Sequence, residues 1–185
     1  GYAHSCVMGF QEALKTNDDL IVLAESDDTF SAFDIEKMIP YLSNCDMVVG
    51  TRQVQALTEK GNQLGMYHVW GNLILAKLIQ LKYFSLLHMG VVQLTDVGCS
   101  YRCIRKNSLK KIINKFTQNE SNEIVTDAQG GLFALFMTIL AIENDLKIIE
   151  IPISFKKRIG FSKTQSEKKF RGTIYGIKFL WYILR

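Results

Sequence analysis

Two short apolar runs that end abruptly in polar residues constrain the fold most. "DDLIVLAE" covers residues 18–25 and "DMVVGTR" covers residues 46–52. Short runs that are apolar throughout are typical of strands buried on both faces, as in a parallel sheet. Segments with the spacing of helices precede, separate and follow these runs. This alternation predicts an α/β fold with a mainly parallel sheet and helices on both faces.

The rest of the chain continues the alternation, and its length suits one domain over residues 1–185. The further expected elements are helices over 2–16, 33–41, 66–81, about 109–116, up to about 144 and about 168–184, strands over 99–106 and 146–158, and a polar loop over 53–65. Asn107 or Ser108 could cap the helix after it, and Asp127 the helix that ends near residue 144. Pro152 indicates an edge strand or a bulge.

Composition narrows the classes of partner and compartment. The net charge of +4 is too small to indicate nucleic-acid binding, although residues 156–171 hold seven basic side chains and one acidic one. That stretch is either a solvated face or a site for phosphates or an anionic membrane surface. The four cysteines lack paired CxxC spacing, which favours reduced thiols in a cytosolic protein over a zinc site. The longest apolar runs, such as 131–142, are too short for the roughly 20 residues of a membrane-spanning helix.

The first apolar run ends in a cluster of carboxylates. Glu25 and Asp27 are two residues apart, so in extended chain they point the same way, and Thr29 continues the series. Because ligands of such sheets bind at the carboxyl ends of the strands, these residues and Arg52 are expected at one edge. Hard oxygen ligands of this kind suit Mg²⁺ or Mn²⁺. The alternative is an aspartate-rich start of the helix over 33–41, capped by Asp28 or Ser31.

Five blocks, in order, resemble the glycosyltransferase family 2 domain of the GT-A fold, and most of all its dolichyl- or polyprenyl-phosphate sugar synthase branch. The blocks are "LIVLAESDDTF" (20–30), "DMVVGTR" (46–52), "WGN" (70–72), "TDVGCSYRCIRK" (95–106) and "KIIEIPISFKKRIGFSK" (147–163). Two features depart from the family pattern. Glu25 stands where the family more often has Asp, and the family's first strand and base-binding pocket would precede Gly1. The resemblance therefore implies the C-terminal portion of a catalytic domain, with the first strand missing.

The resemblance implies an inverting, metal-dependent glycosyltransferase. Its donor would be a UDP- or GDP-sugar and its acceptor a lipid phosphate, with no nucleic-acid partner. A Mg²⁺ or Mn²⁺ ion on Asp27, Glu25 and Thr29 would neutralise the diphosphate leaving group. Arg158 and Lys163 would close over the phosphates as negative charge develops there. Arg52, Ser162 and Asn72 complete the set expected to bind the donor, and the alternative for Arg52 is a salt bridge to a neighbouring carboxylate.

Asp96 distinguishes two acceptors. By resemblance it faces the acceptor, and for a hydroxyl acceptor it would be the general base. A lipid phosphate is already ionised, so Asp96 would then orient groups or balance charge. The alternatives are therefore transfer to a hydroxyl of a surface polysaccharide or lipid-linked oligosaccharide, and a non-catalytic module that binds sugar nucleotides. Aromatic and basic residues in "YGIKFLWYILR" (175–185) suit a membrane interface, so the expected location is cytoplasmic or peripheral on the cytoplasmic membrane face.

Overall fold

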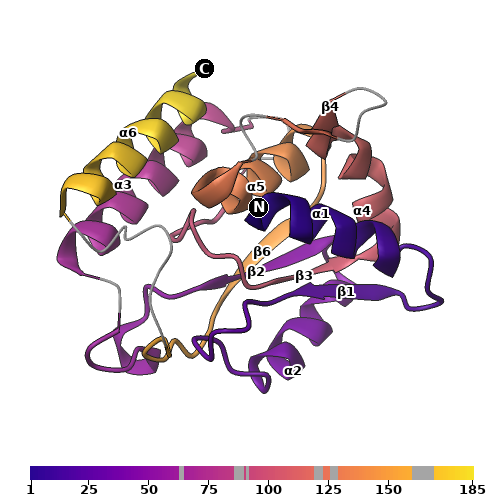
Figure 1. The fold of residues 1–185 in the computed structure, drawn as a ribbon, viewed down its shortest axis with the longest axis horizontal. Helices are drawn as coiled ribbons and strands as arrows, with labels where there is room; N and C mark the ends of the chain where they lie inside the picture. The colour runs from indigo at the N-terminus through magenta and orange to yellow at the C-terminus, as the bar shows by residue number, and fades with distance from the viewer. Residues whose placement is uncertain (63–64, 86–89, 91, 119–122, 126–128, 160–168) are drawn as a thin grey trace.

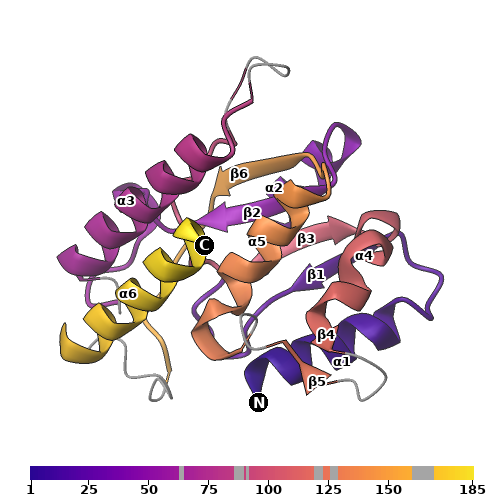
Figure 2. The same cartoon turned by 90° about the horizontal axis from the view of Figure 1, so that it is seen from above.

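The computed structural model describes residues 1–62, 65–85, 90, 92–118, 123–125, 129–159 and 169–185, with only the backbone for 169–171. Its centre is a four-stranded sheet in the order β1-β3-β2-β6. The strands are β1 (Leu20–Leu23), β2 (Met47–Thr51), β3 (Arg102–Arg105) and β6 (Ile148–Pro152). β2 and β6 pair in parallel, whereas β3 is antiparallel to both β1 and β2. β1, β2 and β6 therefore point the same way and β3 points against them (Figure 2).

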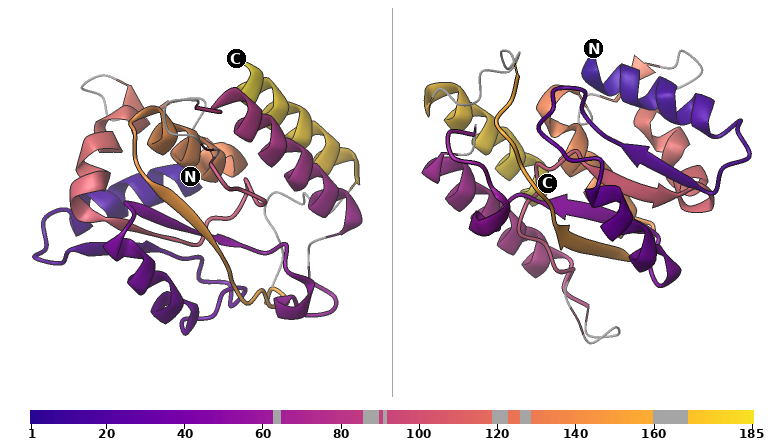
Figure 3. Two further views of the ribbon diagram at one scale, coloured as in Figure 1. Left: turned by 180° about the vertical axis from the view of Figure 1, so that it is seen from behind. Right: turned by 90° about the horizontal axis from the view of Figure 1, so that it is seen from below.

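Helices cover both faces of the sheet, which confirms the expected α/β architecture (Figure 1). One face carries α1 (Tyr2–Ala13), α4 (Lys106–Ile112) and α5 (Phe133–Glu143), and the other carries α2 (Asp34–Met38). Two long helices, α3 (Met66–Lys82) and α6 (Lys169–Leu184), lie side by side at the flank of the sheet. They stay adjacent when seen from behind and from below (Figure 3). A small ribbon joins β4 (Thr117–Gln118) to β5 (Glu123–Ile124).

The core is built mainly from β2 and α5. Every residue of β2 is buried, and α5 is buried from Phe133 to Ala141, which explains why its sequence is apolar on all sides. Below α5, Phe116 packs against three other rings, those of Phe10, Phe133 and Phe136, at centroid distances of 5.4 to 6.4 Å. All four cysteines are free and buried. Among the described helices, none has the length and apolar character needed to cross a membrane.

Several expected helix starts are wrong, although the elements themselves are present. Ser108 does not cap α4: the helix begins at Lys106, and the Ser108 hydroxyl instead donates a 2.6 Å bond to Asp46. No side chain caps α2 either, so neither Asp28 nor Ser31 has that role, and the helix gives way to a 3₁₀ turn over Ile39–Ser43. The expected loop over 53–65 contains a 3₁₀ turn at Gln55–Leu57. Asp127 lies outside the described residues.

The expected strand over 146–158 is shorter, and its proline is placed as the sequence indicated. β6 ends at Pro152 and is an outer strand of the sheet. A proline is tolerated there because its missing amide hydrogen is not needed to pair with a neighbouring strand.

Candidate functional site

Because β3 runs against the other strands, four chain segments meet at one end of the strands, which is the edge of the sheet meant in this subsection. β1, β2 and β6 end at this edge, and the chain enters β3 from it. The segments are 24–29, 51–53, 95–101 and 153–159, and together they are called the rim below. Residues that leave a strand thus stand beside residues that enter one (Figure 2). The rim therefore contains most of the site residues that the sequence predicted.

Glu25, Asp27 and Arg158 form the first cluster of the rim. Arg158 Nη2 lies 2.6 Å from Asp27 Oδ2 and 3.1 Å from Glu25 Oε2, so one guanidinium nitrogen contacts both carboxylates. The remaining oxygens are also occupied. Ser100 donates to Glu25 Oε1 at 2.7 Å, and the Thr29 hydroxyl and amide donate to Asp27 Oδ1 at 2.5 and 3.2 Å. Burial alone would raise the pKa of Asp27, but the Thr29 hydrogen bonds and the charge of Arg158 lower it below its ordinary value.

This cluster fits a divalent cation in its donor chemistry. Two carboxylates meet at one point, and Mg²⁺ is commonly held by one or two carboxylates together with waters and substrate phosphates. Within the described ranges, no three His, Cys, Asp or Glu side chains gather closely enough to hold an ion by themselves. The other ligands would therefore be water and phosphate oxygens. Thr29 was expected as a third ligand, and in the structure its buried hydroxyl donates to Asp27 Oδ1.

Asp96 and Arg52 form the second cluster. Arg52 Nε and Nη2 lie 2.6 and 2.8 Å from the two oxygens of Asp96, a bidentate ion pair in which Asp96 is fully buried. The Arg52 amide, the Asn72 side chain and the Gly98 amide add bonds of 3.2, 3.1 and 3.2 Å. Burial alone would lower the pKa of Arg52, but Asp96 raises it above its ordinary value. The guanidinium also lies 5.2 Å from the centre of the Phe155 ring.

Two residues that support the rim, Glu150 and Ser100, were not predicted from the sequence. Glu150, in the middle of β6, accepts hydrogen bonds from Thr95 and Asp96. Ser100 links the approach to β3 with Glu25. A charged residue inside the apolar run "KIIEIPI" (147–153) is the signal that could have identified Glu150, whereas a serine in a turn offers no comparable signal.

The structure thus brings together Glu25, Asp27, Thr29 and Arg158 in one cluster and Arg52, Asn72 and Asp96 in another. Ser162 and Lys163 lie outside the described residues. The buried guanidinium of Arg102, which belongs to the fourth block, donates to the Ala134 carbonyl of α5 at 3.1 Å and to the Cys99 carbonyl in the rim.

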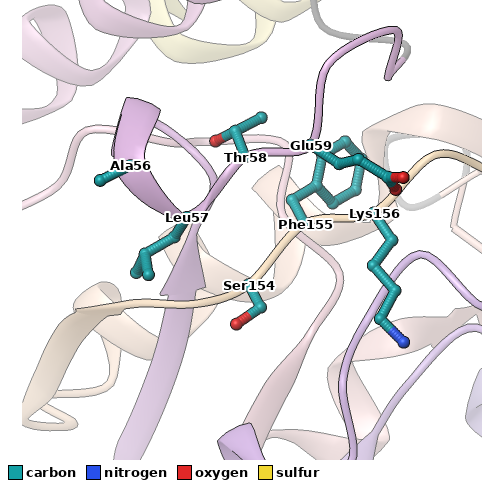
Figure 4. A pocket seen from close by; sticks show the side chains of 7 residues that line it. All are labelled: Ala56, Leu57, Thr58, Glu59, Ser154, Phe155 and Lys156. Carbon is teal, nitrogen blue, oxygen red and sulfur yellow. The ribbon is translucent and has the colours of Figure 1, made fainter.

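A hollow of about 430 Å³ lies beside the rim (Figure 4). It is lined by Ala56, Leu57, Thr58, Glu59, Ser154, Phe155 and Lys156. None of the carboxylates of Glu25, Asp27, Asp96 and Glu150 lines it. It meets the second cluster through Phe155, whose ring lies against the Arg52 guanidinium, and through Thr58, whose hydroxyl donates to the Arg52 carbonyl at 3.3 Å. The carboxylates of the two clusters therefore lie outside this hollow.

The comparison with known proteins agrees with the resemblance seen in the motifs. The chain is 24% identical over 184 residues to polyprenol monophosphomannose synthase of Mycolicibacterium smegmatis (strain ATCC 700084 / mc(2)155). The alignment covers 96% of this chain and 63% of that protein, so the chain spans less than two thirds of its relative. No protein-family model matches. The likeness supports a relationship to the polyprenyl-phosphate sugar synthases of glycosyltransferase family 2.

Proposed function

We propose that this protein is a glycosyltransferase that moves a sugar from a nucleotide diphosphate sugar to a polyprenyl phosphate. The sequence likeness to a polyprenol monophosphomannose synthase and the five ordered motif blocks support this class of reaction. In the reaction, an oxygen of the acceptor phosphate attacks the anomeric carbon as the bond from that carbon to the diphosphate breaks. The products are the glycosyl phosphate lipid and a nucleoside diphosphate. Attack from the face opposite the leaving group inverts the anomeric centre.

The hydrogen bonding of Asp96 is the observation that carries the choice of acceptor. Its two oxygens accept five bonds, three of them from Arg52. These five donors occupy both oxygens of Asp96, so neither oxygen is free to accept the proton of an acceptor hydroxyl. A hydroxyl acceptor needs a base that removes its proton, whereas a phosphate acceptor brings its own anionic oxygen. The geometry therefore favours the phosphate, with Asp96 as an orienting group.

The charge of the first cluster supports a divalent cation on the Asp27 and Glu25 carboxylates. These two carboxylates share a single guanidinium group, that of Arg158. The excess of negative charge would repel a diphosphate unless a cation were bound. A Mg²⁺ or Mn²⁺ ion would act as a Lewis acid on the leaving group. Arg158, once released from the two carboxylates, is placed to contact a diphosphate oxygen.

A donor screen with a short-chain polyprenyl phosphate tests the function. We expect metal-dependent release of nucleoside diphosphate from one of the UDP- or GDP-sugars, and its loss in Asp27→Ala. Asp28→Ala is the matched control, because Asp28 is exposed and its ion pair within the described part of the chain is the 3.9 Å contact with Lys156. Tight binding of a sugar nucleotide without turnover would favour a binding module instead. Unchanged turnover in Asp27→Ala would remove the metal assignment.

Exposed apolar side chains on α3 and α6 support a peripheral position on a membrane that holds the lipid acceptor. They include Met66, Tyr67, Trp70 and Ile74 on α3, and Ile177, Trp181 and Leu184 on α6, at spacings of three or four residues within each helix. We expect the protein to sediment with anionic phospholipid vesicles and the double variant Trp70→Gln, Trp181→Gln to do so less. Phe33→Gln is the control, since Phe33 is equally exposed but lies at the start of α2. Equal loss in both variants would contradict this position.

A further inference from the structure

We propose that Glu150 is a positioning residue that fixes the backbone of the Asp96 segment in the rim. Glu150 is the third residue of β6, level with Val49 of β2. Its Oε2 accepts bonds from the Thr95 amide at 2.8 Å and the Thr95 hydroxyl at 2.7 Å, and its Oε1 accepts a bond from the Asp96 amide at 2.9 Å. One carboxylate thus holds two consecutive amides of a segment 54 residues earlier in the chain.

The Asp96 segment is held by individual contacts because no strand holds it, and Gln80 of α3 donates to its Leu94 carbonyl at 2.7 Å. Residues 92–101 precede β3 and belong to no strand of the described chain. The Thr51 and Thr95 hydroxyls, 2.7 Å apart, add one link to the end of β2. The side chain of Asp96 is held from the opposite side by Arg52 and Asn72. Glu150 therefore sets the backbone of Asp96, while Arg52 and Asn72 set its carboxylate.

A carboxylate is the side chain that fits this place, because all three partners are donors. A glutamine of the same shape has one oxygen and one NH₂ group, so it would direct a donor at one of the two amides. At least one bond to the segment would be lost, and a buried amide would be left unpaired. Burial and the neighbouring Asp96 charge raise the pKa of Glu150, and the three hydrogen bonds act against that rise.

The consequence for catalysis rests on the proposed function. A shift of the Asp96 backbone would move the carboxylate that orients the acceptor, and misplacement of a rim group by about 1 Å can cost about a hundredfold in rate. Residues that support a site through one intermediate residue typically cost about 10- to 100-fold when replaced. In this proposal Glu150 acts through Asp96 and not on the donor. We therefore expect kcat to fall and the KM for the donor to change little.

The test compares Glu150→Gln with Glu12→Gln, an exposed glutamate of α1. Amide hydrogen exchange, measured by NMR, reports how firmly the Asp96 segment is held, and it does not depend on enzymatic turnover. We expect the Thr95 and Asp96 amides to exchange at least about tenfold faster in Glu150→Gln and unchanged in Glu12→Gln. In the transfer assay, kcat per donor-binding site should fall about 10- to 100-fold, with the KM for the donor within about threefold.

A milder variant keeps the test decisive if Glu150→Gln does not fold. Thr95→Val removes the hydroxyl bonds to Glu150 and Thr51 but keeps both amide bonds to Glu150, so the same changes are expected in smaller measure. Unchanged exchange of the two amides in either variant, or a kcat within twofold of the wild type in Glu150→Gln, would overturn the positioning role. If the wild type transfers no sugar, the proposed function fails, but the exchange measurement still decides whether Glu150 holds the segment.

Discussion

Replacing Arg158 by glutamine should strengthen the binding of Mn²⁺ in the absence of nucleotide. In the structure the Arg158 guanidinium lies on both carboxylates of the acidic cluster, at 2.6 and 3.1 Å. A cation bound to the same carboxylates must first displace it. The Arg158, Asp27 and Glu25 side chains are 25%, 18% and 28% exposed, so the contact is partly screened by water. For charged pairs in such a setting we take about 1–2 kcal/mol.

That free energy sets the expected size of the effect. Each 1.4 kcal/mol corresponds to a factor of ten, so the Kd for Mn²⁺ should fall about 5- to 30-fold in Arg158→Gln. The same variant should be less stable in a chelator, because the two carboxylates then lack a counter-ion. A loss of about 1–2 kcal/mol in a domain of this size lowers the Tm by about 2–8 °C. The change in metal affinity and the change in stability therefore have opposite signs.

Isothermal titration with Mn²⁺ alone measures the first quantity, and a thermal melt in EDTA measures the second. Lys156→Gln is the matched control, since Lys156 is a neighbouring exposed base that reaches only Asp28, at 3.9 Å. We expect neither quantity to change in this control. Equal or weaker Mn²⁺ binding in Arg158→Gln would refute the competition. An unchanged Tm would show that the contact contributes nothing to stability.

Three further changes test the fold around the rim. Phe116→Ala opens a cavity in the aromatic cluster, and urea titration should show a loss of about 3–5 kcal/mol; a loss below about 1 kcal/mol would contradict the packing. Gly50→Ala places a Cβ 2.6 Å from Ile153 Cδ1, so a loss of about 1–3 kcal/mol is expected in the same assay, and no loss would mean that Ile153 moves freely. Burial alone would raise the pKa of Asp46, but the hydrogen bonds from the Ser108 hydroxyl and the Lys147 amide, together with the nearby lysine charges, lower the pKa below the ordinary 3.8. The stability advantage over Asp46→Asn should therefore be present above pH 3.8 and be lost as the pH falls through the lower folded value; an advantage independent of pH would refute it.

The sequence predicts the acidic cluster well because its pattern is local. Glu25 and Asp27 are two residues apart after a buried strand, and the resemblance supplied Arg158 from the far end of the chain. The bidentate pair of Arg52 with Asp96 was not predicted as a pair. Both residues were expected near ligands, but which charges neutralise each other depends on how the segments meet.

Other features had no sequence signal that could specify them. β3 has four residues, and its apolar pattern is the same for either direction, so its reversal could not be read from the sequence. Ser108 has the propensity of a helix cap, but it lies inside the first turn of α4, where its hydroxyl donates to the Asp46 carboxylate. Glu150 was expected to lie in a strand, yet its role depends on the place where the Asp96 segment returns.

The wide spacing of the rim segments along the chain has a consequence for biosynthesis. Arg158 follows Glu25 by 133 residues, and Asp96 follows Arg52 by 44. On a ribosome, the segments that carry Glu25 and Arg52 emerge long before β6, and the pairing of distant segments is intrinsically slow. A nascent chain arrested before residue 150 should therefore hold its carboxylates without their later partners. The ability to recognise a ligand should appear only once the last strand has left the exit tunnel.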